Sequence, residues 1–420
     1  MFNQRVIPSL QAKSGADNRA AIVLAKNVTG LATLRALAGL SLDLHAIIFS
    51  RGEPISFSRY GKKVYFVGKE KDEPALLQFL IEYLDQLGGR PVVIPTSDTL
   101  ALFLARYYEV LKGRCAIWEN SYIDLSEIIC KNLLYRNASN AKVDSVPWIE
   151  STNVDEIAEW SQRNSAPYLL KPFYEGHQKQ RPFGKNKSLP SREALMAYVT
   201  ENPTDSIIIQ RMIKGGDGFI FDTYGYSDRM GRILTMALHR RLRQNPCNFG
   251  STSYGEIPAQ LSIEAEQTIL TATERLLGHI KYHGIFGIEW LLEQSTGKFY
   301  LIDFNARPFT TIGHLTDCGM NLPALAYAEL TNEMTTKLVR IPKLKRILWI
   351  DIKKDLDSLR SCEPRLVVVA KTWLLSISQC RSFAYASLRD PGPGIQSAAL
   401  TIYMAARFAF KRFIHFFTSV

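Results

Sequence analysis

The stretch Phe286-Gly287-Ile288-Glu289-Trp290, with Tyr300-Leu301-Ile302-Asp303-Phe304-Asn305-Ala306-Arg307-Pro308 a few residues on, decides the fold of this chain. Polar residues recur at alternate positions among apolar ones, which predicts two strands. The turn Gln294-Ser295-Thr296-Gly297 lies between them and predicts that the strands pair. On paired strands Glu289 and Asp303 face one side, and Asn305, two residues further, lies on the same face.

This shared face has the composition of a metal and phosphate site. The carboxylates of Glu289 and Asp303 and the amide oxygen of Asn305 are hard ligands that suit Mg²⁺, with Mn²⁺ as an alternative. Arg307 lies two residues further and places a planar cation where a phosphoryl or carboxylate group would sit. A surface hairpin with ordinary charges is the alternative, and it explains poorly why these side chains share one face.

Two lysines upstream favour the same chemistry. Lys131 lies in a predicted helix over 125–138, and Lys171 closes the apolar strand Tyr168-Leu169-Leu170-Lys171-Pro172. Burying a lysine is costly unless an anion pairs with it. Phosphate oxygens of a nucleotide are the natural partners, so both lysines are candidates for phosphate binding.

The first third of the chain alternates between predicted strands and helices. The strands are expected at 20–25, 44–49, 63–67 and 91–95, and the helices at 30–39, 73–87 and 99–111. This order predicts a parallel sheet with helices on both faces, as in a Rossmann-like domain. The first strand-to-helix turn, Asn27-Val28-Thr29-Gly30, lacks the G-x-G-x-x-G fingerprint, so this domain need not bind a nucleotide.

Composition is that of an ordinary globular protein, with 46% hydrophobic and 22% charged residues in 420. Six scattered cysteines without a C-x-x-C pair predict free thiols in a reducing cytosol. His279 and His283 are expected to share a helix face and not to bind metal. The segment Met1–Asp17 is not expected to be a secretory signal, and no apolar run is long enough for a membrane span.

The net charge of +11 is unevenly distributed. From Lys337 onward there are 15 Lys or Arg and 5 Asp or Glu, so nearly all of the excess lies in the C-terminal part. A nucleic-acid enzyme would carry a basic stripe across its folded body, so no nucleic-acid partner is expected. An excess confined to the tail favours an anionic membrane leaflet, with a solubilising face as the alternative.

A basic amphipathic helix is predicted at the end of the chain, over 395–417, after the breaker Asp390-Pro391-Gly392-Pro393-Gly394. Such a helix either lies in a membrane interface or docks on its own protein. Its apolar stripe consists of Ile402, Ala406, Phe410, Phe413 and Phe417. We therefore expect a cytoplasmic protein whose tail either contacts the inner face of the membrane peripherally or docks on the protein itself, the commoner fate of an aromatic stripe.

Taken in order, these residues resemble the ATP-grasp superfamily over Asn120 to Glu333. The positions that match are Lys131, Lys171-Pro172, Gln210-Arg211-Met212-Ile213, Gly215-Gly216-Asp217, Glu289 and Asp303-x-Asn305-x-Arg307. Within the superfamily the chain is similar to carboxylate–amine ligases near D-aspartate ligase and the carbamoyl-phosphate-synthase-like group. That similarity rests on Ser58-Arg59-Tyr60, Pro95-Thr96-Ser97-Asp98 and Arg240-Arg241-Leu242-Arg243-Gln244-x-Pro246.

The resemblance implies α/β and α+β architecture in three parts. A Rossmann-like pre-ATP-grasp domain over 1–120 precedes a two-lobed ATP-grasp domain over 121–334, which holds the nucleotide and Mg²⁺ site. A basic amphipathic C-terminal helical extension covers 335–420. The implied activity joins a small-molecule carboxylate to an amine through an acyl phosphate, with ATP converted to ADP and phosphate.

The resemblance also implies residue roles. Those at the phosphates and metal are Lys131 and Lys171 for ATP phosphates, Glu289, Asp303 and Asn305 for Mg²⁺, and Arg307 for the acyl phosphate. Those at the nucleoside are Gln210, Arg211, Met212 and Ile213 for adenine and Asp217 for the ribose. His239, Arg240 and Arg241 are implied for the substrate carboxylate.

The sequence departs from the superfamily's pattern at three places. Asp303 stands where a glutamate is usual, Gln210 replaces an acidic residue common at the adenine edge, and the loop from His177 to Lys187 has no glycine cluster. These departures keep open a second hypothesis, a degenerate ATP-grasp module that binds nucleotide without turnover and acts as a regulatory or scaffold subunit.

Overall fold

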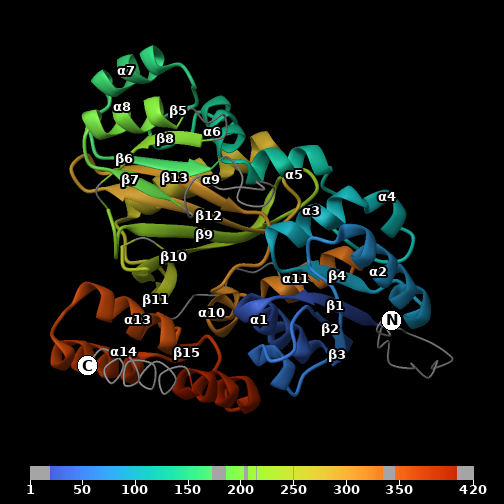
Figure 1. Ribbon diagram of the computed structural model, residues 1–420. Helices are drawn as coiled ribbons and strands as arrows, with labels where there is room; N and C mark the ends of the chain where they lie inside the picture. The colour runs from blue at the N-terminus through green and yellow to red at the C-terminus, as the bar shows by residue number, and fades with distance from the viewer. Residues whose placement is uncertain are drawn as a thin grey trace, which may run out of the picture. The chain divides into compact units, whose positions relative to one another are not determined.

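The computed structural model describes residues 19–172, 186–202, 207–213, 215–248, 250–333 and 346–403 (Figure 1). The chain divides into two compact units. The first combines Met1–Ile117, Arg243–Ile257 and Pro308–Val420, and the second combines Trp118–Leu242 with Pro258–Arg307. The grouping in space joins the C-terminal extension to the N-terminal segment, which the sequence prediction treated as separate parts.

A parallel four-stranded sheet forms the centre of the first unit, in the order β3-β2-β1-β4. The strands are β1 (Ala20–Ala25), β2 (Asp43–Ile48), β3 (Lys62–Tyr65) and β4 (Val92–Pro95). Helices α1 (Asn27–Leu37), α2 (Glu73–Leu87) and α3 (Asp98–Arg106) alternate with them. Every residue of β1 is buried, as expected for a strand covered on both faces. The predicted Rossmann-like alternation is confirmed.

The rest of the first unit carries a second set of strands. Strand β11 (Ser251–Ile257) pairs antiparallel with β14 (Ile347–Ile350), which pairs parallel with β15 (Ser382–Phe383). The accompanying helices are α10 (Ile312–Asp317), α11 (Leu322–Leu330), α13 (Ile352–Cys362), α14 (Leu366–Gln379) and a helical segment over 391–403. These elements bring the C-terminal extension into the fold of the first unit.

Two buried carboxylates hold this extension in place. Arg243 donates to both oxygens of Asp355 at 2.8 Å, and Asp355 is fully buried. Asp390 accepts from the Arg35 side chain at 2.9 Å, from the Ser58 hydroxyl at 2.8 Å and from the backbone N–H of Arg59. Buried charges are tolerated when they are paired and hydrogen-bonded in this way.

The second unit contains two sheets (Figure 1). One has the order β5-β8-β6-β7, from Trp148–Ile149, Ile207–Arg211, Tyr168–Pro172 and Lys187–Leu189. In the other sheet, antiparallel pairing gives the order β13-β12-β9-β10. These strands are β13 (Lys298–Asn305), β12 (Gly284–Glu293), β9 (Ile220–Ser227) and β10 (Ile233–Asn245). Strand β10 belongs to this unit as far as Leu242. Its helices are α5 (Tyr122–Ile129), α6 (Lys131–Asn140), α7 (Val154–Arg163), α8 (Arg192–Glu201) and α9 (Ile263–Ile280).

Several element predictions were incomplete. The helix expected over 125–138 is two helices, because Cys130 between α5 and α6 has an extended backbone. The helix expected over 99–111 is interrupted at Tyr107, before α4 (Tyr108–Leu111). The breaker at 390–394 instead starts a helix at residue 391, because proline is favoured in the first helical turn. Strands β10 and β11 and helix α9 were not predicted.

The prediction that all six cysteines are free thiols is wrong for two of them. Cys247, in the β10–β11 connection, forms a disulfide with Cys362 at the end of α13. The Cα atoms lie 6.2 Å apart across 115 residues of sequence. Cys115, Cys130, Cys318 and Cys380 are free. The sequence could not predict this disulfide, because the bond depends on a contact between the β10–β11 connection and α13.

Within the described residues, no helix combines the length and the apolar character needed to cross a membrane. Of the amphipathic helix predicted over 395–417, residues 404–417 lie outside the described part of the chain, and only its beginning is seen as helix.

Candidate active site

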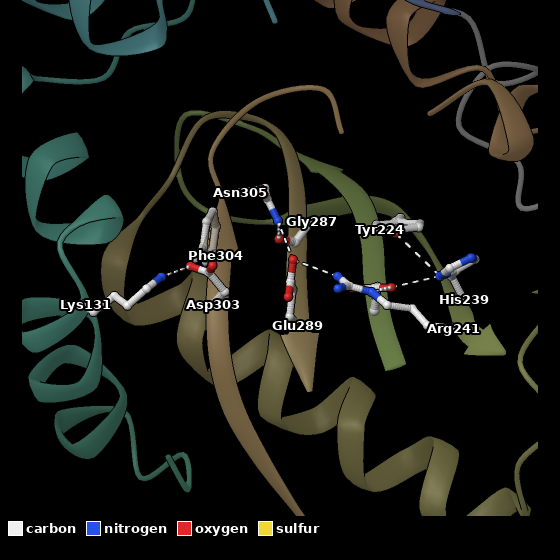
Figure 2. Close-up of polar contacts among 10 residues, drawn as sticks. Lys131, Tyr224, His239, Arg241, Gly287, Glu289, Asp303, Phe304 and Asn305 are labelled. Carbon is white, nitrogen blue, oxygen red and sulfur yellow. Dashed lines mark hydrogen bonds and ion pairs between the residues drawn. The ribbon is translucent and has the colours of Figure 1, made fainter. Parts of the chain in front are cut away.

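The hairpin of β12 and β13 places Glu289, Asp303 and Asn305 on one face, as the sequence predicted. Glu289 pairs directly with Asp303, and Gly287 pairs with Asn305. Residues directly opposite each other in an antiparallel pair lie on the same face of the sheet. The side-chain amide of Asn305 donates to Oε1 of Glu289 at 3.2 Å, which links the two predicted metal-ligand positions on this face (Figure 2).

This face continues across two more strands as a single row. Glu289 also pairs with Asp222 of β9, and Asp222 pairs with His239 of β10. Three carboxylates and an imidazole therefore lie side by side across four neighbouring strands, in the order Asp303, Glu289, Asp222 and His239. Asp222 and His239 are fully buried, whereas 17% of the Glu289 side chain and 30% of the Asp303 side chain are exposed. The accessible end of the row is thus the predicted metal site.

Arg241 of β10 joins the middle of the row. It donates to both oxygens of Asp222, at 3.0 and 2.5 Å. Its guanidinium also lies 2.7 Å from Oε1 of Glu289 (Figure 2). Nδ1 of His239 lies 2.8 Å from Asp222. Burial alone would raise the pKa of Asp222, but the Arg241 guanidinium and the His239 contact bring it down to about 2. Burial lowers the pKa of Arg241, but its two carboxylate partners raise it well above the usual value.

Lys131 reaches the other end of the row from α6. Its ammonium group lies 2.8 Å from Oδ1 of Asp303, and its side chain is almost completely buried (Figure 2). Lys131 is the first residue of α6, so the interruption at Cys130 determines where this lysine projects. The two residues are 172 positions apart in sequence, and the pairing agrees with the prediction that Lys131 needs an anion.

The other sheet of the second unit presents Lys171 and Gln210 on a common face. Leu169 pairs with Gln210, and Lys171 pairs with Ile208, across β6 and β8. The opposite face of these strands packs into a buried apolar cluster that includes Leu170 and Ile209. Lys171 is half-buried, and Gln210 is buried beside Tyr135 of α6, whose pKa burial raises to about 12. The Tyr135 hydroxyl donates to the carbonyl of Ile302 in β13, so α6 connects both sheets.

The remaining nucleoside positions lie at the end of β8 and just beyond it. Arg211 forms an ion pair of 2.9 Å with Glu293 of β12, and the N–H of Met212 donates to the carbonyl of Pro167. Ile213 is buried, and Asp217 is half-buried in the loop that precedes β9. Arg307 is half-buried immediately after β13. Most of the loop from His177 to Lys187 lies outside the described residues.

The three residues expected at the substrate carboxylate are separated by the strand. His239 and Arg241 lie on the face of Glu289, whereas Arg240 lies on the opposite face, with its guanidinium 5.6 Å from the Phe221 ring and its Nε donating to the carbonyl of Gly218. His239 is buried against Asp222, and Arg241 is held by two carboxylates. The structure therefore does not bring Arg240 together with the row.

The donor set at the accessible end of the row fits Mg²⁺. Glu289, Asp303 and Asn305 offer two carboxylates and an amide oxygen on one face, and both of the contacts of Glu289 described here reach only its Oε1. In the described part of the chain no group of three or more His, Cys, Asp or Glu side chains is placed to hold a metal ion. Mg²⁺ commonly takes only one or two carboxylates and completes its shell with water and phosphate oxygens.

The prediction that His279 and His283 share a helix face is wrong. The helix ends at Ile280, and Lys281 adopts a left-handed backbone, so His279 and His283 do not share a helix face. His283 instead accepts a hydrogen bond from the N–H of Glu119 and is buried.

Asp222 is the residue of this site that the sequence analysis missed. Its signal was present, because an acidic residue in the apolar, aromatic segment Gly218–Tyr226 must be paired if the strand is buried. Its partners come from two other strands, however, and only the pairing of β9 with β10 and β12 identifies them.

The fold is the ATP-grasp fold that the resemblance in sequence implied. The structure is similar to N5-carboxyaminoimidazole synthetase from Staphylococcus aureus, at 14% identity and a TM-score of 0.61 over 82% of this chain and 86% of that one. It is also similar to the L-amino acid ligase from Bacillus licheniformis, at 15% identity and a TM-score of 0.57 over 78% of each chain.

A third similar structure is the biotin carboxylase domain of Hydrogenobacter thermophilus 2-oxoglutarate carboxylase, solved with MgADP, ADP and bicarbonate. It is 15% identical, with a TM-score of 0.60 over 76% of this chain and 70% of that one. No protein-family model and no curated protein sequence matches this chain. At identities of this size the likeness establishes the fold alone.

Proposed function

We propose that this protein is an ATP-dependent carboxylate–amine ligase that forms an amide bond through an acyl phosphate. One observation carries the proposal: on an ATP-grasp fold, Glu289 and Asp303 are direct cross-strand partners, with Lys131 bonded to Asp303. This juxtaposition supplies the carboxylates for a metal and a cation for phosphate in one place. The similar structures support it, since all three named above are ligases or carboxylases and one was solved with MgADP.

The chain's own residues would act mainly by binding and orienting. Lys131 and Lys171 would neutralise ATP phosphates, and Gln210 and the residues after it would contact the adenine. Glu289, Asp303 and Asn305 would hold Mg²⁺, which supplies charge neutralisation at the phosphates when bound. Phosphoryl transfer requires chiefly positioning and charge stabilisation, which these side chains offer.

The reaction would proceed in two steps. A substrate carboxylate oxygen attacks the γ-phosphorus of ATP, which gives an acyl phosphate and ADP. The amine then attacks the acyl carbon and expels phosphate, losing one proton as the amide forms. Arg307, half-buried at the end of β13, would steady the acyl phosphate between the steps.

A degenerate module that binds nucleotide without turnover is the second candidate. The ion pairs favour it, because Lys131 already pairs with Asp303 and Arg241 with Glu289. Asp303 is also one methylene shorter than the glutamate usual at this position. Against it, the ligase positions Glu289, Asn305 and Arg307 are all present, and an ion pair at a metal site can rearrange when Mg²⁺ and phosphate arrive.

The test is ADP release from ATP and Mg²⁺ against pools of amino acids and small carboxylic acids. The wild type is compared with Glu289→Gln and with Glu159→Gln, a matched change at an exposed residue of α7. Turnover that requires both an acid and an amine, and that is lost only in Glu289→Gln, is the expected result. Nucleotide binding without ADP release in any pool would support the degenerate module, and absence of nucleotide binding would contradict both candidates.

The cytoplasmic location and the peripheral membrane contact through 395–420 stay predictions. The uneven charge supports the membrane contact, but most of that segment lies outside the described residues. The cytosolic prediction was based on six free thiols, and the Cys247–Cys362 disulfide counts against it, because such bonds are rare in the cytosol.

A further inference from the structure

Helix α14 has an apolar outer face. Its inner face is anchored: Val369 and Ser376 are buried, Ser376 accepts from Arg243, and the Trp373 indole donates to the carbonyl of Ile352 in α13. On the opposite side Val367, Leu374 and Leu375 are 81%, 60% and 52% exposed. Apolar helix faces are normally buried, so these three side chains mark a face of α14 that the described residues leave uncovered.

Exposed apolar side chains gather in this part of the chain. Of the 17 large hydrophobic residues that are exposed among those the structure describes, ten lie between Leu366 and Tyr403. They come from α14, from Leu388 and from the helical segment over 391–403, which contains no charged residue. Single exposed apolar residues are ordinary on a protein surface, whereas several on one helix face, as on α14, indicate an interaction surface.

The charges around this surface are mainly positive, although Arg365, just before α14, forms an ion pair of 2.8 Å with Glu363. Residues 364–420 contain seven Lys or Arg and a single acidic residue, Asp390. Asp390 is buried and bound by Arg35 and Ser58, so it offers no negative charge at the surface. Lys371, Arg381 and Arg389 are exposed along the same segment, so a partner that is apolar and negatively charged fits this surface best.

We propose that the outer face of α14, together with the helical segment over 391–403, binds an anionic lipid surface. Apolar side chains flanked by basic ones insert at the boundary between headgroups and acyl chains, while the cations pair with anionic headgroups. A second copy of this chain fits less well, because two such surfaces would bring mainly like charges together. The proposal adds α14 to the contact predicted for the tail and is independent of the ligase activity.

The experiment is co-sedimentation of the full-length protein with vesicles of phosphatidylglycerol or of phosphatidylcholine at low and high salt. The wild type is expected to bind only the anionic vesicles and to release them as salt rises. Val367→Asp/Leu374→Asp should weaken binding by at least about tenfold, because a charge is disfavoured in the apolar boundary. Val367→Ser/Leu374→Ser should weaken it as well, without a change of charge.

The control is Ile123→Asp/Ile263→Asp, which makes the same charge change at two exposed apolar residues in the first turns of α5 and α9, where Asp is well tolerated. It should bind like the wild type. The proposal is overturned if the wild type ignores anionic vesicles, or if the control loses as much binding as the α14 variants. It is also overturned if light scattering shows a dimer that the α14 variants convert to monomer. ADP release measured without vesicles reports on the ligase separately.

Discussion

Asp222 illustrates how one residue organises the candidate site. Its carboxylate is fully buried and holds both His239 and the guanidinium of Arg241, which in turn reaches Glu289. Glu289 is thus oriented from behind by a buried ion pair while its accessible side faces the predicted metal position. We interpret Asp222 as a positioning residue, one step removed from the groups that would touch the nucleotide.

Replacing Asp222 by alanine should destabilise the protein by about 3 kcal/mol, because removing one partner leaves a buried charge with less compensation. This destabilisation lies at the low end of the range usual for breaking a buried ion pair, because Glu289 still contacts Arg241. Denaturant unfolding measures the change. As a control, Asp357→Ala removes an exposed i,i+4 partner of Lys353, and solvent screening should keep its effect below about 0.5 kcal/mol.

The stability difference between wild type and Asp222→Ala should depend on pH. The folded pKa of Asp222 is about 2, below its ordinary value of 3.8, so its contribution is complete above pH 3.8 and declines as pH falls toward 2. The difference in free energy of unfolding between the two proteins should therefore be constant near neutral pH and become smaller below about pH 4. A difference that is unchanged in acid would contradict the assigned ion pair.

At the scale of elements, several contacts join helix α13 to the segment Arg243–Ile257, which holds the end of β10 and strand β11. Arg243 binds Asp355, Ser358 donates to the carbonyl of Gln244, and Cys247 is bonded to Cys362. The same strand β10 carries His239 and Arg241 on the site face. The C-terminal extension therefore contacts the end of β10 that lies in its own unit, from Arg243 onward.

Reducing the Cys247–Cys362 disulfide should lower the free energy of unfolding by about 2–4 kcal/mol, because the bond closes a long loop in the unfolded chain. The measurement is denaturant unfolding with and without a reductant. Thiol titration of the denatured, unreduced protein should find four thiols, and six after reduction. The variant Cys247→Ser/Cys362→Ser should show no effect of the reductant, and six thiols before reduction would refute the bond.

At the scale of the whole molecule, ligand binding should be visible as stability. A ligand that binds only the folded state adds about 2.7 kcal/mol at a concentration 100 times its Kd. Saturating ATP with Mg²⁺ should therefore raise the denaturant midpoint of the wild type and of Glu159→Gln. Glu289→Gln should gain much less, since it lacks one proposed metal ligand. An equal gain in all three proteins would place nucleotide binding away from Glu289.

The sequence by itself determined the features that depend on local periodicity. Alternation with a period of two identified β12 and β13 and placed Glu289, Asp303 and Asn305 on one face, which the register confirms. Alternating strands and helices identified the parallel sheet of the first unit. Both patterns can be recognised within a few consecutive residues, because the direction of each side chain follows from the backbone repeat.

Only the tertiary structure decided which distant residues meet. The contact of Lys131 with Asp303, the position of Asp222 between His239 and Glu289, and the Cys247–Cys362 bond all join segments that no local pattern relates. The apolar sequence of α14 gave no sign that half of it faces outward. Strand register and helix packing are set by the summed burial of the whole fold, so these contacts exist only once the chain has folded.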